Sequence, residues 1–137
     1  MWSKHKRGLL SELIAEEHLV RNDLCVARPI SGHCEFDLLA FDCGEWQKYQ
    51  VKTIYWDKSK KRYICSLVTS HIRGNGRRTN KKYTKKSFDV LLAVEPGTKT
   101  VYEIPFNAIE GRRSITFYFN NPKTRQKNNN NFEEYKR

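Results

Sequence analysis

The sequence lacks the long apolar stretch that a membrane protein requires. No hydrophobic run approaches the roughly 18 residues of a membrane-spanning helix. The basic segment Met1–Arg7 precedes an acidic amphipathic stretch, whereas a signal peptide would continue into an unbroken apolar region. These absences predict a soluble, cytoplasmic protein that does not associate with a membrane.

Paired cysteines at metal-binding spacing are also missing. The four cysteines, Cys25, Cys34, Cys43 and Cys65, follow no C-x-x-C pattern. His33 stands beside Cys34, but the two short-spaced ligand pairs of a zinc site are absent. We therefore expect reduced, partly buried thiols rather than a zinc site.

Acidic residues are scarce beside the basic ones. Fifteen Asp and Glu oppose 26 Lys and Arg among 137 residues, which gives a formal net charge of +11. Such an excess favours a polyanionic partner, with nucleic acid ahead of an acidic membrane. A ribosomal-type RNA-binding protein would carry the same charge, so charge alone does not select a function.

The chain is organised around a predicted β-hairpin in residues 36–56. Two runs rich in apolar, β-branched and aromatic residues flank a short polar segment that contains Gly44. A two-residue loop would place Asp37 opposite Gln50, and a four-residue loop would place it opposite Lys52. All three side chains share a face in both cases, because side chains alternate along a strand. A three-residue loop or a bulge would break this parity.

The first hairpin strand has two apolar faces, with Leu39 and Phe41 on one and Leu38 and Ala40 on the other. This pattern predicts a central strand that is covered on both sides. Buried Asp and Lys side chains are costly unless they are paired or coordinate a metal. The pattern therefore leaves two readings open: a structural ion pair between Asp37 and Lys52, or a catalytic site.

Residues 8–20 read as an amphipathic helix. Its broad apolar face comprises Leu9, Leu10, Leu13, Ile14, Leu19 and Val20. Three carboxylates, those of Glu12, Glu16 and Glu17, fall within the same arc, which is too many for a plain core helix. Periodicity does not say which of them enters a site.

Three sequence segments together resemble a known family. Lys6-x-Gly8-x-x-Ser11-Glu12, Phe36-Asp37 and Gln50-Val51-Lys52-Thr53 are similar in order, spacing and strand context to the PD-(D/E)XK nuclease superfamily, closest to the group I intron-associated homing endonucleases of cyanobacterial type. The resemblance spans residues 6–109. It implies an α/β (α+β) fold with a restriction-endonuclease-like core, in which helices flank a mixed β-sheet.

The same resemblance implies a metal-dependent, sequence-specific double-stranded DNA endonuclease that is encoded in an intron. Glu12, Asp37 and Gln50 would hold Mg²⁺ or another divalent cation such as Mn²⁺, and Lys52 would orient or deprotonate the attacking water. Two departures stand out. Glu35 precedes Phe36-Asp37, whereas many relatives carry a proline directly before the Asp, and Gln50 stands where an acidic residue is expected two positions before Lys52. We expect Glu16 and Glu17 to pair with nearby basic side chains instead.

A dense basic segment follows the predicted site. Residues 71–87 contain no acidic residue. We predict DNA contacts from Arg73, Arg77, Arg78, Asn80, Lys81, Lys82, Lys85 and Lys86. Cleavage of both strands needs two sites, so we expect a homo-oligomer, a dimer at least, with a tetramer as the larger alternative, on a pseudo-palindromic target.

The predicted domain covers residues 1–119. Residues 120–137 are rich in Asn, Lys and Arg and predict a flexible basic tail. Two alternative functions stay open at this point. One is a structure-specific resolvase of Holliday junctions, and the other is a non-catalytic DNA- or RNA-binding module on a degenerate nuclease fold, which Gln50 would favour.

Overall fold

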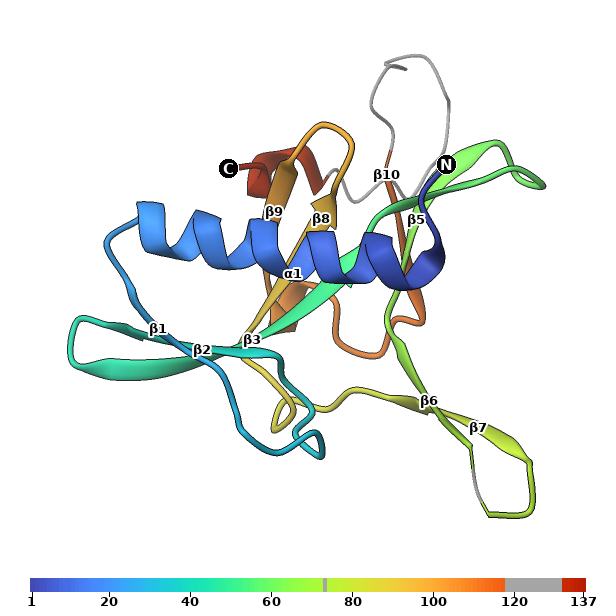
Figure 1. Ribbon diagram of the computed structural model, residues 1–137, viewed down its shortest axis with the longest axis horizontal. Helices are drawn as coiled ribbons and strands as arrows, with labels where there is room; N and C mark the ends of the chain where they lie inside the picture. The colour runs from blue at the N-terminus through green and yellow to red at the C-terminus, as the bar shows by residue number, and fades with distance from the viewer. Residues whose placement is uncertain (73, 118–131) are drawn as a thin grey trace.

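The computed structural model describes residues 1–72, 74–117 and 132–137. One α-helix lies across a five-stranded mixed sheet (Figure 1), as the sequence predicts for the fold class. The helix is α1 (Lys4–Arg21), and the sheet has the order β1 (Cys25–Ala27), β2 (Leu38–Asp42), β3 (Glu45–Thr53), β8 (Val90–Glu95) and β9 (Thr100–Pro105). No described helix is long and apolar enough to cross a membrane.

The β2–β3 hairpin closes through a two-residue turn. Cys43 and Gly44 both adopt positive φ angles, of 49° and 89°, as a tight hairpin turn of this length requires. The register pairs Leu38 with Tyr49, and one further step along the strands places Asp37 beside Gln50. Of the two loop lengths that the sequence left open, the structure therefore shows the shorter one.

Helix α1 begins at Ser3, whose side chain accepts a hydrogen bond from the backbone N–H of Lys6. Its buried stripe consists of Ser11, Ile14, Ala15 and Leu19. This stripe packs on the sheet face formed by Leu38, Ala40, Tyr49, Val51, Leu92, Val94 and Val101. The predicted apolar face was therefore partly wrong, because Leu9, Leu13 and Val20 are exposed by 55%, 46% and 59%.

The opposite face of the sheet packs on a second, three-stranded sheet of order β10-β5-β4. Its strands are β4 (Tyr55–Asp57), β5 (Arg62–Ser66) and β10 (Ser114–Phe117). The core between the two sheets contains Cys65, Leu91, Ala93, Tyr102, Ile104 and Phe117, together with Phe88, which precedes β8. Strand β5, which comes after β3 and β4 in the chain, thus lies outside the main sheet.

Strand β2 is less enclosed than its sequence predicts. It lies next to the edge strand β1, and Phe41 on its second face is 40% exposed, in ring contact with Trp46. Strand β3 is the central strand instead, because it pairs with β2 on one side and runs parallel to β8 on the other.

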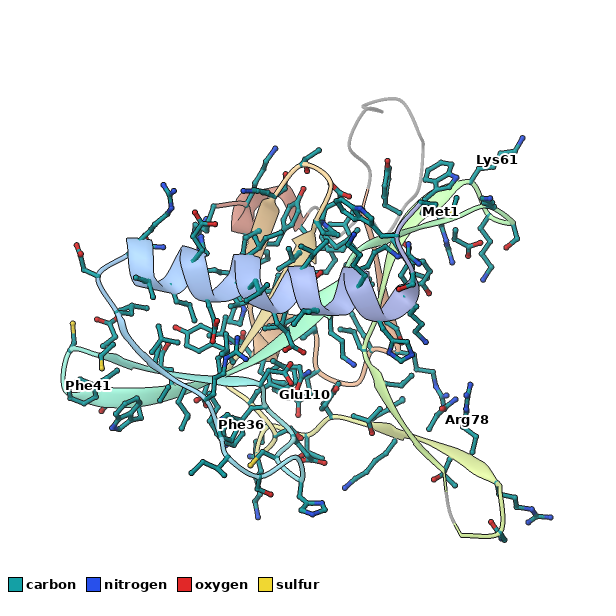
Figure 2. All side chains as sticks on the ribbon, viewed as in Figure 1. Met1, Phe36, Phe41, Lys61, Arg78 and Glu110 are labelled. Carbon is teal, nitrogen blue, oxygen red and sulfur yellow. The ribbon has the colours of Figure 1, made fainter. Side chains whose placement is uncertain are left out.

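A separate hairpin projects from the body of the molecule (Figure 1). Its strands, β6 (Val68–Ile72) and β7 (Arg78–Lys82), pair only with each other among the described residues. The sequence predicts a basic loop here, whereas the structure has an extended two-stranded arm. Figure 2 shows Arg78 near its far end.

The last residues of the chain return to the core. After β9 comes the short 3₁₀ helix η1 (Phe106–Ala108), and near the C-terminus lies η2 (Phe132–Tyr135). Phe132 is buried in the core, and the backbone N–H of Arg137 bonds the carbonyl of Val101. The prediction of a flexible tail was therefore wrong for residues 132–137, which pack on the body of the protein. Residues 120–131 lie outside the described residues, and the division at residue 119 stays a prediction.

Candidate active site

The side chain of Asp37 completes the hydrogen bonding of β3 at the point where β2 begins. Its backbone N–H donates to the carbonyl of Tyr49 at 2.8 Å. Its Oδ2 atom accepts from the backbone N–H of Val51 at 2.8 Å and from Gln50 Nε2 at 2.6 Å. The carboxylate therefore takes the place of a backbone acceptor. Pairing between β2 and β3 ends at Leu38 and Tyr49, so among the described residues no strand pairs with this edge of β3 from Gln50 to Thr53, and the edge is open.

Burial sets the protonation behaviour of both Asp37 and Lys52. Desolvation raises the pKa of Asp37, and it outweighs the opposing effects of the Val51 hydrogen bond and the nearby Lys52 charge. Desolvation likewise lowers the pKa of Lys52. Both groups are therefore shifted toward their neutral forms, which is a common property of catalytic acids and bases.

The structural ion pair between Asp37 and Lys52 is not formed. No contact of 4.0 Å or less joins the Asp37 carboxylate to the Lys52 ammonium. Lys52 Nζ lies instead 5.4 Å from the ring centroid of Tyr83. No local sequence pattern predicts this contact, because the tertiary fold brings Tyr83 to the site. Lys52 is thus held by a neutral ring and keeps its N–H donors for another partner.

Glu12 reaches the site from α1. It lines a cavity of about 210 Å³ together with Asp37, and a larger cavity together with Lys52. Burial raises the pKa of Glu12, and the charge of Asp37 raises it further. Ser11 Oγ lies 2.8 Å from Thr53 Oγ1, so the residues next to Glu12 and Lys52 fasten the helix to β3.

The carboxylates of Glu16 and Glu17 on α1 form ion pairs with basic side chains, as the sequence predicts. Glu16 forms a two-pronged ion pair with Arg28, which lowers the pKa of Glu16. Glu17 pairs with Arg21 one turn along the helix. Glu12 has no such partner within the described residues, which distinguishes it as the carboxylate available to the site.

A divalent cation fits this set of donors. Two carboxylates, one of which raises the pKa of the other, line a common cavity, and a cation between them would relieve that repulsion. Gln50 adds a neutral oxygen donor. No cluster of three His, Cys, Asp or Glu residues exists within the described residues. Two carboxylates nevertheless suit Mg²⁺, which keeps several of its waters.

The predicted DNA-binding residues lie on or beside the projecting arm, with one outside the described residues. Arg78, Asn80, Lys81 and Lys82 are on β7, Arg77 precedes it, Lys85 and Lys86 follow it, and Arg73 lies outside the described residues. Lys81 pairs with Glu35 at 3.4 Å, and Lys82 Nζ donates to the carbonyl of Gly111. These two lysines fix the base of the arm to the body, while Arg77 and Arg78 stay exposed.

Asp89 has a structural role. Its Oδ2 atom accepts from the backbone N–H of Lys48 at 2.8 Å, and its own N–H donates to the Lys48 carbonyl. The carboxylate therefore ties the start of β8 to β3, at the opposite side of β3 from Asp37.

Comparison with known proteins places this chain in a family. The model of a family described as PD-(D/E)XK endonuclease matches residues 2–137. A search of curated proteins gives no match. Among solved structures, a bacterial homing endonuclease, I-Ssp6803I, superposes with a TM-score of 0.83 at 17% identity, over 98% of this chain and 89% of that one. MepB gives a TM-score of only 0.48 at 14% identity, over 91% of this chain and 87% of that one.

Proposed function

The chain belongs to the PD-(D/E)XK endonuclease family, and from that premise we propose that it is a metal-dependent, sequence-specific endonuclease of double-stranded DNA, of the homing type. The observation that carries the proposal is the open edge of β3. There Asp37 and Glu12 line one cavity, and Lys52, which is half-buried and forms no salt bridge within the described residues, lines the adjoining cavity with Glu12. Likeness to a homing endonuclease in fold supports the finer assignment.

Asp37 and Glu12 would hold the cation, with Gln50 as a neutral third donor. A bound divalent cation supplies Lewis acidity at the cleaved phosphate. Gln50 Nε2 donates to Asp37 Oδ2 and thereby fixes the carboxylate in place. Because Gln50 is uncharged, this donor set carries one negative charge fewer than a set with a carboxylate at that position.

Lys52 orients or deprotonates the attacking water in this mechanism. Desolvation lowers its pKa, which makes the neutral amine more accessible than that of an exposed lysine. After it takes the proton, the ammonium stabilises the negative charge that develops on the phosphate. The face of Tyr83 favours that charged form and holds the side chain over the site.

Cleavage of both strands of a duplex needs two copies of this site. We therefore propose a homo-oligomer, at least a dimer, on a pseudo-palindromic DNA target. The basic arm supplies phosphate contacts through its exposed arginines and lysines, and Arg77, Arg78 and Asn80 supply the candidates for contacts with base edges.

End mapping tests the proposal. The purified protein is incubated with random-library or genomic DNA, with Mg²⁺ or with a chelator, and new ends are sequenced. Ends that recur at one motif with Mg²⁺ only, and that Lys52→Ala removes, would support the homing-type endonuclease. Scattered ends or none, despite tight binding, would contradict it. Cleavage of four-way junctions without sequence preference would then identify a resolvase, and inactivity there would leave a binding module.

A further inference from the structure

A second and larger cavity adjoins the site. It measures about 650 Å³ and lies between the first half of α1 and β3. Lys4, Arg7, Gly8 and Ser11 line it from the helix, and Lys52 and Thr53 line it from the strand. Glu12 also lies on its wall, so whatever fills this cavity contacts the same two residues that stand at the proposed reaction centre.

Two cations of this cavity, Lys4 and Arg7, lack an ion-pair partner within the described residues. Arg7 Nε is buried and has no hydrogen-bond partner, and neither Arg7 nor Lys4 forms a salt bridge within the described residues. Lys4 is also close enough to Lys52 that its charge lowers the pKa of Lys52. A desolvated donor on a guanidinium is costly when it stays unpaired. By contrast, Arg28 on the far side of Glu12 is fully paired with Glu16.

Gly8 gives a second, independent observation. It lies inside α1 and lines the cavity, yet a Cβ atom built on it would meet no atom of the protein within 4 Å. A glycine inside a helix is less stable than an alanine, because it loses more backbone entropy on folding. No neighbour within the described residues explains why this position lacks a side chain. A ligand that approaches the helix backbone at Gly8 would explain it, because a Cβ atom would then be in its way.

We propose that this cavity holds the phosphate group of the DNA strand that neighbours the cleaved phosphate. Arg7 and Lys4 bind its oxygens, and Gly8 allows the sugar-phosphate backbone to approach α1. The inference rests on the proposed endonuclease function and assigns Arg7, Lys4 and Gly8 as substrate-positioning residues. They orient the strand so that the next phosphate lies between Lys52 and the carboxylates of Glu12 and Asp37.

A phosphodiester suits these residues better than an ammonium or an apolar group. Its oxygens accept two parallel N–H bonds from a guanidinium, which is a strong and directional contact. The nearby acidic group, Glu12, is the one that the cation would neutralise. DNA and cation therefore occupy the two cavities beside Glu12 without placing like charges in contact.

The salt dependence of DNA binding tests this assignment without any cleavage. Affinity for a random-sequence duplex is measured by fluorescence anisotropy in a chelator at several salt concentrations. Log K falls as log[salt] rises, and Arg7→Gln should make this negative slope shallower by about 0.9, the change expected when one phosphate contact is lost. Lys6→Gln is the matched control, since Lys6 is in the same turn but does not line the cavity, and it should keep more of the slope.

Gly8→Ala separates the proposed contact from a structural role. The alanine should raise the melting temperature or leave it unchanged, because helix propensity improves and no protein atom clashes. The kcat/KM of DNA cleavage by the Mg²⁺-loaded protein should fall at least tenfold, mainly because KM rises. Leu9→Ala is the control at the adjacent, exposed position and should keep KM unchanged.

The outcomes separate this inference from the endonuclease proposal. If the wild type cleaves DNA while Arg7→Gln keeps both the salt slope and KM, the phosphate position is wrong and the endonuclease stands. If the wild type cleaves nothing while Arg7→Gln still lowers the slope by about one phosphate contact, the endonuclease is wrong and the phosphate position stands.

Discussion

The open edge of β3 and the β6–β7 arm use the same residue types in opposite environments. At the edge, Lys52 is half-buried, desolvation lowers its pKa, and its ammonium lies over the ring of Tyr83. On the arm, Arg77 and Arg78 are exposed to water. An exposed cation keeps its hydration and its charge, whereas a desolvated one is held closer to its neutral form. One region is thus suited to proton transfer and the other to electrostatic attraction.

The difference also appears in how each region is anchored. Asp37 closes the hydrogen bonding of β3, and Ser11 with Thr53 fastens the helix to the same strand. At the base of the arm, Lys81 contacts Glu35 and Lys82 donates to the carbonyl of Gly111. A rigid site beside a projecting arm suggests that the chemistry and the affinity can be changed separately.

The largest expected effect is the loss of cleavage when the edge is altered. Lys52→Ala and Asp37→Ala should each slow single-turnover cleavage by roughly 10²–10⁴-fold, the typical contribution of one acid–base group or charge-stabilising group. DNA affinity should stay within a few-fold of the wild type. Anisotropy measures affinity, and a gel assay of labelled duplex measures the rate.

Lys48→Ala is the matched control, because Lys48 lies on the same strand and face but donates to the carbonyl of Lys86. It should keep the wild-type rate. Asp37→Ala also leaves the N–H of Val51 unpaired, which should cost about 1–3 kcal/mol of stability. If Lys52→Ala or Asp37→Ala no longer folds, the replaced residue stabilises the fold and its role in catalysis is not shown by the lost cleavage. Thermal melting detects that outcome.

A smaller effect should follow from changes on the arm. Replacing both Arg77 and Arg78 by Gln should weaken binding by roughly tenfold for each residue and lower the salt slope by about 1.8 in total. The cleavage rate at saturating protein should not change. Lys99→Gln, in the turn between β8 and β9, is the control for lost charge. A lower cleavage rate of the arm variant at saturating protein would mean that the arm also contributes to catalysis.

The pH dependence of cleavage should reflect the edge alone. Burial raises the pKa of Asp37 and of Glu12, so both must lose their protons at a higher pH than exposed carboxylates do before they hold a cation. Cleavage should therefore fall in acid above the usual carboxylate range of about 4. On the alkaline side the rate should rise through the lowered pKa of Lys52.

Lys52→Arg should remove that alkaline rise, since a guanidinium stays protonated. Rates at saturating protein across the pH range give the profile, and anisotropy at each pH confirms that binding persists. An unchanged alkaline rise in Lys52→Arg would mean that another group deprotonates the water.

The smallest effect is a gain in stability. Because the pKa of Glu12 is raised in the folded protein, the folded state binds its proton more tightly than the unfolded state does. The ionised side chain therefore destabilises the fold at neutral pH. Glu12→Gln should raise the melting temperature at pH 7, and this advantage should vanish below about pH 4, where Glu12 is protonated in both states. Equal melting at pH 7 would contradict the desolvated placement of Glu12.

The sequence predicted the parts of the site that depend on local pattern. The helix and the β2–β3 hairpin follow from periodicity and from the Cys43–Gly44 turn, and alternation places Asp37, Gln50 and Lys52 on one face. The sequence also predicted that Glu16 pairs with a basic side chain, and the structure shows that its partner is Arg28.

The remaining features depend on contacts between residues that are distant in sequence. Tyr83 follows β7 and lies over Lys52 of β3, and Phe132 reaches the core after a stretch of polar composition. The exposure of Phe41 depends on β1 being an edge strand, which the pattern of β2 does not indicate. The cavity at Gly8 depends on where α1 crosses β3. No local pattern carries this information.

Single-turnover cleavage as a function of protein concentration tests the central division most directly. Three proteins are compared on the mapped target with Mg²⁺: the wild type, Lys52→Ala and the Arg77→Gln/Arg78→Gln variant. We predict that Lys52→Ala lowers only the saturated rate, and that the arm variant raises only the protein concentration at half saturation. A fall in the saturated rate of the arm variant as large as that of Lys52→Ala would contradict the account.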